Sequence, residues 1–188
     1  MMSIRSIYES IGVEAFYSSG IEYENPHSHQ IEALIRNNSA ALPLENVLDL
    51  ACGTGLVTSV LKELGHSKVI GIDPFLNDEY TIRTGCQCYR MSFRDIVING
   101  CLLPLNARLN DGLPKFSCII CSFALHLCKH SMLPDLLWRL SERSNTLVVI
   151  SPSKFPLIGK PAVENFCLTA SKKRIHFRSY NLPILQNG

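Results

Sequence analysis

Long apolar runs are absent from this chain, and so is the pattern of a secretory signal. No stretch of 18 consecutive apolar residues occurs, and the first residues, MMSIRSIYESIGVEAFY, lack a basic segment followed by an apolar one. We therefore expect no membrane partner and a cytoplasmic or nuclear location. An excess of one charge is also absent, because a net charge of +2 over 188 residues gives no support for a surface that follows a nucleic-acid backbone.

The local excess of positive charge lies near the end of the chain, at Lys172, Lys173, Arg174 and Arg178. The surrounding segment alternates as an antiparallel hairpin does, and basic residues in a hairpin commonly mark a solvated turn or protect a sheet edge. We favour that interpretation, with nucleic-acid contact as the alternative.

A disulfide framework is not expected either, although the chain contains eight cysteines. Most of them stand inside apolar runs of a chain that is too long for a small secreted scaffold, so buried, reduced thiols are predicted. Cys118 and Cys121 are three residues apart on a predicted strand and therefore point to opposite faces, which prevents them from binding one metal ion. At 46% hydrophobic residues, the chain has enough apolar material for one domain with a three-layer core.

The most informative feature present is the segment VLDLACGTG at 47–55, followed by KVIGID at 68–73. Residues 47–50 form an apolar run suited to a buried parallel strand, and the spacing of leucine and valine after residue 55 predicts a helix. Gly53 and Gly55 permit a turn whose backbone approaches a ligand closely. Asp73 follows the second strand, where a carboxylate accepts hydrogen bonds from ribose hydroxyls. The order predicts a site for a nucleotide-shaped cofactor.

Two details of the sequence argue against a dinucleotide as this cofactor. Thr58 stands where the dinucleotide fingerprint has its third glycine, and Asp49 places a carboxylate where it would repel a pyrophosphate. The string DLACGTG resembles motif I of the class I S-adenosylmethionine-dependent methyltransferases, through Asp49, Ala51, Gly53, Thr54 and Gly55. The resemblance implies S-adenosylmethionine, a cation without phosphate, as the cofactor. An NAD-dependent oxidoreductase is kept as an alternative.

The resemblance also implies the fold. We expect an α/β, three-layer, doubly wound sheet of about seven strands, mostly parallel with a C-terminal antiparallel hairpin. The chain would be one domain, 1–188, in which a helical part, 1–40, lies over the cofactor end of a Rossmann-like core, 41–188. From periodicity we expect helices at 28–37 and 133–140, strands at 86–91, 116–123 and 146–151, and the hairpin around 172–174.

The predicted cofactor site collects the residues at the carboxyl ends of the strands. They are Asp49, Ala51, Cys52, Gly53, Gly55, Asp73, Pro74, Ser92, Phe93 and Ser122. Ser92 and Phe93 are implied to flank the adenine; many family members have an acid where Ser92 stands, and Asp95 is the candidate substitute.

The acceptor side is less clearly indicated. His126 is the titratable group in SFALHL at 122–127, the usual position of motif IV, and is our candidate proton acceptor; a hydrogen bond to the backbone is the alternative. The polar, aromatic loop 17–27 supplies four candidates for substrate contact, Tyr17, Tyr23, Asn25 and His27. Asn25 and Pro26 would alternatively begin the next helix. A zinc site combining His126, Cys128 and His130 with His27 and His29 is conceivable but unsupported, and we predict no metal.

The absence of several motifs excludes some classes of methyl acceptor. The chain has no NPPY or DPPY in motif IV, no Pro-Cys pair there, and Ser117 in place of an acid at the start of the fourth strand. Methyl transfer to oxygen or nitrogen of a small molecule or of an RNA nucleotide remains. A non-catalytic scaffold with the same fold is the alternative, and an activating protein partner and the oligomeric state stay open.

Overall fold

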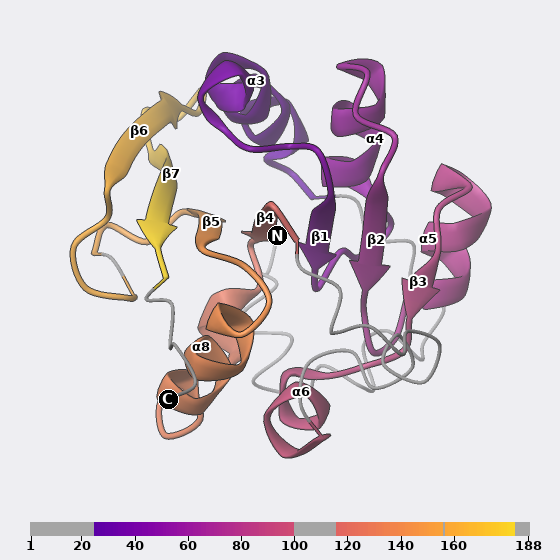
Figure 1. The fold of residues 1–188 in the computed structure, drawn as a ribbon. Helices are drawn as coiled ribbons and strands as arrows, with labels where there is room; N and C mark the ends of the chain where they lie inside the picture. The colour runs from indigo at the N-terminus through magenta and orange to yellow at the C-terminus, as the bar shows by residue number, and fades with distance from the viewer. Residues whose placement is uncertain (1–24, 100–115, 156, 183–188) are drawn as a thin grey trace.

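Figure 1 shows the computed structural model, which describes residues 25–99, 116–155 and 157–182. One sheet of seven strands runs through it in the order β3-β2-β1-β4-β5-β7-β6. The strands are β1 (Val47–Leu50), β2 (Val69–Ile72), β3 (Cys88–Tyr89), β4 (Cys118–Ser122), β5 (Thr146–Ser151), β6 (Val163–Leu168) and β7 (Arg174–Asn181). β1 to β5 pair in parallel, whereas β7 pairs antiparallel with both β5 and β6. The predicted fold class is confirmed, including the closing hairpin.

Helices cover both faces of this sheet (Figure 1). The α-helices are α3 (Ser28–Asn38), α4 (Leu56–Glu63), α5 (Asn77–Thr84), α6 (Phe93–Asn99) and α8 (Leu133–Ser141), and two short 3-10 helices are η1 (Ser39–Ala41) and η2 (Leu125–Leu127). α3 and α4 bury their apolar sides on one face, α6 and α8 on the other. None of the helices in the described residues is both long and apolar enough to cross a membrane.

Two apolar cores result, one on each face. Cys118 belongs to the core under α3 and α4, and Cys121 belongs to the core under α6 and α8. The prediction that these thiols point to opposite faces is therefore confirmed. All four residues of β1 are buried, as expected for a central parallel strand covered on both sides.

The third strand is shorter than predicted. The pattern of residues 86–91 indicated a six-residue strand, but only Cys88 and Tyr89 pair with β2. β2 ends at Ile72, so the next residues of the edge strand have no ladder to join. Ser92 and Asp95 then begin α6 by hydrogen-bonding each other, with the Ser92 backbone N–H and hydroxyl donating to the Asp95 carboxylate at 2.8 and 2.7 Å.

Within the described residues the helical N-terminal part is represented by α3. Its residues Ile31, Leu34 and Ile35 are buried as the periodicity predicted, packed beside α4 and the β6–β7 hairpin. At the start of this helix, the ring centroid of His27 lies 5.4 Å from that of Phe123, which directly follows β4. The beginning of α3 thus reaches the carboxyl edge of the sheet.

Candidate functional site

The strand order reverses between β1 and β4, and the glycine turn lies at this point. Ala51, Gly53 and Gly55 have positive φ angles of 55°, 55° and 90°. A Cβ at Gly55 would lie 2.4 Å from Thr84 Cγ2, so this glycine is required by packing against α5. A Cβ at Gly53 would meet nothing within 4 Å. Gly53 therefore leaves open space over the turn, where a ligand can approach the backbone.

Asp73 ties this turn to the end of β2. Its Oδ2 accepts a 3.0 Å hydrogen bond from the backbone N–H of Gly53, and its Oδ1 accepts bonds of 2.9 Å from the N–H groups of Phe75 and Leu76. The side chain is only 7% exposed. The carboxylate holds the turn and the start of α5 together, and Oδ2, which accepts one bond, keeps acceptor capacity for a ligand hydroxyl.

Asp49 is a fully buried carboxylate below the turn. The Thr58 hydroxyl donates to its Oδ2 at 2.7 Å and in turn accepts from the Tyr80 hydroxyl at 2.8 Å. The other oxygen, Oδ1, has no hydrogen-bond partner among the described residues. Burial raises the pKa of Asp49 to about 7, and the charge of Asp73 adds to this rise. Such a group favours a cationic ligand nearby and disfavours a phosphate.

Ser122 provides a second unpartnered polar atom on the same side of the sheet. Ile120 pairs with Asp49 in the β1–β4 ladder, and Ser122 is two residues further along β4, so the side chains of Asp49 and Ser122 point to the same face. The Ser122 hydroxyl is buried and has no hydrogen-bond partner in the described part of the chain. Of the remaining turn residues, Cys52 is buried with its Sγ 3.5 Å from that of Cys88, and Pro74 is half-buried.

Ser92 and Phe93 lie on the wall of a hollow of about 570 Å³. The hollow is also lined by Leu127, the last residue of η2, and by residues between Cys128 and Met132. The sequence-predicted adenine residues thus face a cavity. Asp95, the candidate substitute acid, is engaged by Ser92, and the hydrogen bonds from the Ser92 backbone and hydroxyl lower the pKa of Asp95.

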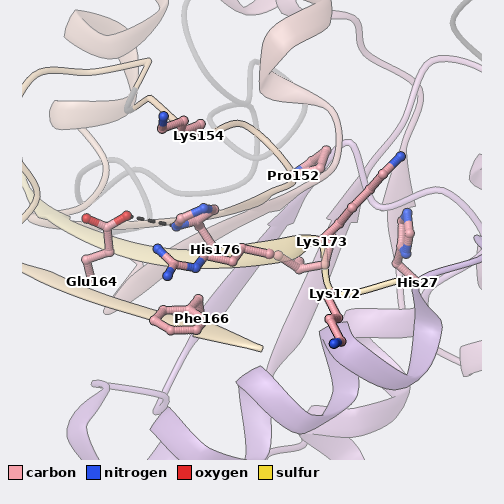
Figure 2. A pocket seen from close by; sticks show the side chains of 10 residues that line it. His27, Pro152, Lys154, Glu164, Phe166, Lys172, Lys173 and His176 are labelled. Carbon is pink, nitrogen blue, oxygen red and sulfur yellow. Dashed lines mark hydrogen bonds and ion pairs between the residues drawn. The ribbon is translucent and has the colours of Figure 1, made fainter. Parts of the chain in front are cut away.

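A second, larger hollow of about 820 Å³ lies by the β6–β7 hairpin (Figure 2). Residues from four separate parts of the chain line it, including His27, Pro152, Lys154, Phe166, Lys173 and His176. His27 was predicted to contact substrate. The others were not predicted to line a site, because they come together only when the hairpin folds back beside β5.

The remaining predicted acceptor residues are placed differently. His126 is exposed on η2 and lines neither hollow. Asn25 accepts hydrogen bonds from the N–H groups of His27 and Ser28, through its side chain and its carbonyl, as a residue that begins α3 would. Tyr17 and Tyr23 lie outside the described residues. In the described ranges, no group of three or more His, Cys, Asp or Glu side chains is arranged to hold a metal ion.

Arg178 differs from the sequence-based expectation. It was predicted to belong to a solvated or edge-protecting basic cluster, but it is only 2% exposed. Its guanidinium donates to Glu164 Oε1 at 2.8 Å and to the carbonyls of Ser153 and Lys154 at 2.9 and 3.1 Å. The prediction is wrong for Arg178 because β7 lies between β5 and β6, so its side chains are covered. It is consistent with the exposed Lys172, Lys173 and Arg174.

Solved structures of methyltransferases are similar to this fold. Magnesium protoporphyrin IX methyltransferase from Synechocystis PCC 6803, with bound SAM, superposes with a TM-score of 0.59 over 94% of this chain and 93% of its own, at 13% identity. The methyltransferase domain of bacterial CtHen1 gives 0.55 over 83% and 98%, at 12% identity. The chain has the class I methyltransferase fold. TehB from Haemophilus influenzae shares it, with a TM-score of 0.53 over 90% of this chain and 67% of its own, at 13% identity.

Sequence comparison adds two relatives of this methyltransferase-fold chain. An uncharacterised protein of Schizosaccharomyces pombe is 29% identical over 197 residues, covering 82% of this chain and 76% of that protein. The mitochondrial ubiquinone biosynthesis O-methyltransferase of Dictyostelium discoideum is 48% identical over 46 residues, which are 23% of this chain and 14% of that enzyme. No protein-family model matches the chain.

Proposed function

We propose that this protein is an S-adenosylmethionine-dependent methyltransferase. The observation that carries the proposal is the glycine turn after β1. Gly53 faces open space there and donates to the carboxylate of Asp73, and the buried, partly unpartnered carboxylate of Asp49 stands in β1 just before the turn. Two acids at this turn suit a ligand with ribose hydroxyls and positive charge. They do not suit a pyrophosphate, and this weighs against NAD.

The polar groups of the site match the chemical groups of S-adenosylmethionine. The Asp73 carboxylate would accept hydrogen bonds from the ribose hydroxyls, and the adenine would bind in the hollow beside Ser92 and Phe93. Asp49 provides negative charge near the turn, and the Ser122 hydroxyl is available as a hydrogen-bonding group at the end of β4. The neighbour from Synechocystis was crystallised with bound SAM, which supports the same assignment here.

The reaction would break the bond between the methyl carbon and sulfur while the acceptor oxygen or nitrogen forms a bond to that carbon. Sulfur keeps the electron pair of the broken bond, and the acceptor loses a proton to a base or to water. Because the sulfonium supplies a good leaving group, holding the acceptor in line provides much of the acceleration. His126 stays our candidate for the proton acceptor, on its exposed position in η2.

The acceptor class is proposed more broadly, as oxygen or nitrogen of a small molecule or of an RNA nucleotide. Similarity to a ubiquinone biosynthesis O-methyltransferase over 46 residues supports oxygen. Ser117, which stands where an acid would indicate a ribose methyltransferase, bonds instead to the backbone of Asn46, accepting from its N–H at 3.0 Å and donating to its carbonyl at 2.9 Å.

Calorimetric titration with S-adenosylhomocysteine, run beside NAD, tests the cofactor assignment. We expect the wild-type protein to bind S-adenosylhomocysteine and not NAD. Asp73→Asn should weaken binding by about tenfold or more, because a hydrogen bond to a charged group contributes about 1.5–3 kcal/mol. Asp78→Asn, which changes an exposed carboxylate on the neighbouring α5, is the matched control and should bind as the wild type does. Wild-type binding of NAD alone would overturn the proposal.

A scaffold that binds the cofactor without transferring its methyl group is the second candidate. Ser92, in place of the acid of many family members, motivates it, since its hydroxyl serves to begin α6. Transfer of label from S-adenosylmethionine to an extract fraction, lost in Asp73→Asn, would exclude this candidate.

A further inference from the structure

The 820 Å³ hollow by the β6–β7 hairpin is the one drawn in Figure 2. One of its lining residues, His27, lies against Phe123 with 5.4 Å between ring centroids, and Phe123 follows β4 at the carboxyl edge. Another, Pro152, directly follows β5. The hollow therefore begins where the central strands end, at the edge where ligands bind in open α/β sheets.

Four cations surround this hollow. Lys154 comes from the loop after β5, while Lys172, Lys173 and Arg174 come from the hairpin turn and the start of β7. All four are exposed, and none forms an ion pair within the described residues. Lys154 lies over the ring of Phe155 and Arg174 over that of Phe166, but no carboxylate of the described residues neutralises any of the four charges, so a ligand anion can pair with them.

Among the described residues that line the hollow, Glu164 is the one acid, and it is already neutralised. Its Oε1 accepts from Arg178 Nε at 2.8 Å and from His176 Nδ1 at 2.9 Å, the contact drawn in Figure 2. Burial acts to raise the pKa of Glu164, but the hydrogen bonds and charges of Arg178 and His176 together outweigh it and lower that pKa, so the carboxylate remains ionised. Burial and the neighbouring Arg178 lower the pKa of His176, which adds little charge of its own at neutral pH. The described part of the lining is therefore positive as a whole.

Contacts within the fold position two of these cations, Lys154 and Arg174. Arg178, almost fully buried, donates to the carbonyls of Ser153 and Lys154 and so attaches the loop that carries Lys154 to β7. The half-exposed ring of Phe166 forms an apolar part of the wall, with the Arg174 guanidinium carbon 4.4 Å from its centroid. A positive hollow with one apolar wall matches a ligand that combines an anionic group with an apolar body.

We propose that this hollow binds the phosphate or carboxylate group of a small-molecule methyl acceptor. Its role as the acceptor site rests on the proposed function, whereas anion binding does not. A small molecule is favoured over RNA because the cations gather in one hollow of a chain with net charge +2, instead of forming a basic stripe. The volume also lies within the range of small-molecule sites, about 300–1,000 Å³.

Titrations with inorganic phosphate and with malonate, followed by amide NMR shifts of the full chain, test this site. We expect one or both anions to shift the amides of residues 153–154 and 172–176, and the two arms distinguish phosphate from carboxylate. Lys173→Glu should weaken binding about tenfold, because it replaces an attraction with a repulsion. Lys68→Glu reverses an exposed charge at the opposite, amino edge of the sheet and should leave binding unchanged.

Three results would overturn the proposal. They are the absence of shifts at the hairpin with both anions, equal weakening by Lys68→Glu and Lys173→Glu, and binding of a ten-nucleotide RNA more than about 100-fold tighter than phosphate with a steep salt dependence. S-adenosylhomocysteine is titrated into the same sample. Anion binding without cofactor binding would remove the acceptor role and the proposed function together, while cofactor binding without anion binding would contradict only the anion site.

Discussion

The backbone N–H of Gly53 donates a 3.0 Å hydrogen bond to Oδ2 of Asp73, 20 residues further along the chain. This bond joins the turn after β1 to the loop after β2, at the edge where the sheet reverses its strand order. It holds the backbone of the turn in position before any ligand arrives. Preorganisation of this kind lowers the entropic cost of binding.

The two glycines of the turn should respond differently to alanine. Gly55→Ala places a Cβ 2.4 Å from Thr84 Cγ2 and 3.0 Å from Tyr80 Cδ2 at a φ of 90°, so we expect it to lower the free energy of unfolding by about 2–4 kcal/mol. Gly53→Ala meets no neighbour, so we expect a loss of about 1 kcal/mol from its φ of 55°. Its Cβ would enter the open space over the turn and weaken S-adenosylhomocysteine binding at least about tenfold.

Urea denaturation and calorimetry of the two variants check this pair. An alanine at residue 53 that leaves cofactor affinity unchanged would mean that the ligand does not lie over the turn.

Asp49 should make stability depend on pH. Its pKa rises from the ordinary 3.8 to about 7 in the folded protein, because burial disfavours the charged form. The folded state therefore binds the proton more tightly than the unfolded state, and stability should fall as pH rises from about 4 to 7 and then level off. Asp49→Asn removes this dependence on pH. Between pH 4 and 7 the free energy of unfolding of the variant, relative to that of the wild type, should therefore increase by a few kcal/mol, on the order expected from the pKa shift of Asp49.

Denaturation curves at pH 4.5, 5.5, 6.5 and 7.5 measure the effect. Parallel pH dependences for the wild type and Asp49→Asn would show that Asp49 is ionised at no cost.

The central thiols should be unreactive in the folded protein. Burial raises the pKa of both Cys118 and Cys121 to about 12, so the reactive thiolate is scarce at pH 8. Cys86, Cys88 and Cys167 are only partly buried. Brief treatment with iodoacetamide at pH 8, mapped by mass spectrometry, should modify these three before Cys118 and Cys121. Equal modification of Cys118 would contradict the burial described here.

Arg178 should be important for stability. Arg178→Ala removes donors from Glu164 and from the carbonyls of Ser153 and Lys154, and we expect it to lower the free energy of unfolding by about 3 kcal/mol. Arg174→Ala, an exposed change on the same strand, should lower it by less than about 0.5 kcal/mol. Thermal or chemical denaturation of both variants measures the difference, and equal effects would contradict a structural role for Arg178.

The turn and the central strands were predictable because their signals are local. The alternation between apolar strand, glycine turn and helix lies within residues 47–73, and burial on both faces explains the apolar strands. The role of Gly55 was harder to predict. The sequence indicated that it contacts a ligand, whereas the structure shows that close packing against Thr84 of α5 requires a glycine there. Such packing joins residues far apart in the chain, and periodicity does not reveal it.

The hollow beside the β6–β7 hairpin could not be predicted from the sequence for the same reason, because its lining residues are far apart in the chain. Lys172 and Lys173 were noticed as a local cluster, but their proximity to Lys154 and His27 arises only from the antiparallel return of β7 beside β5. Likewise, β3 ends early because its neighbour β2 ends at Ile72, which the pattern of residues 86–91 does not contain.

Amide hydrogen exchange with and without S-adenosylhomocysteine tests whether the cofactor binds at the glycine turn, because it reports which residues the ligand protects. We expect slower exchange at residues 51–55, 73–76, 92–93 and 127–132 when the ligand is present, in the wild type and not in Asp73→Asn. Slower exchange confined to the β6–β7 hairpin, or no change at the glycine turn at a ligand concentration that saturates binding, would contradict this expectation.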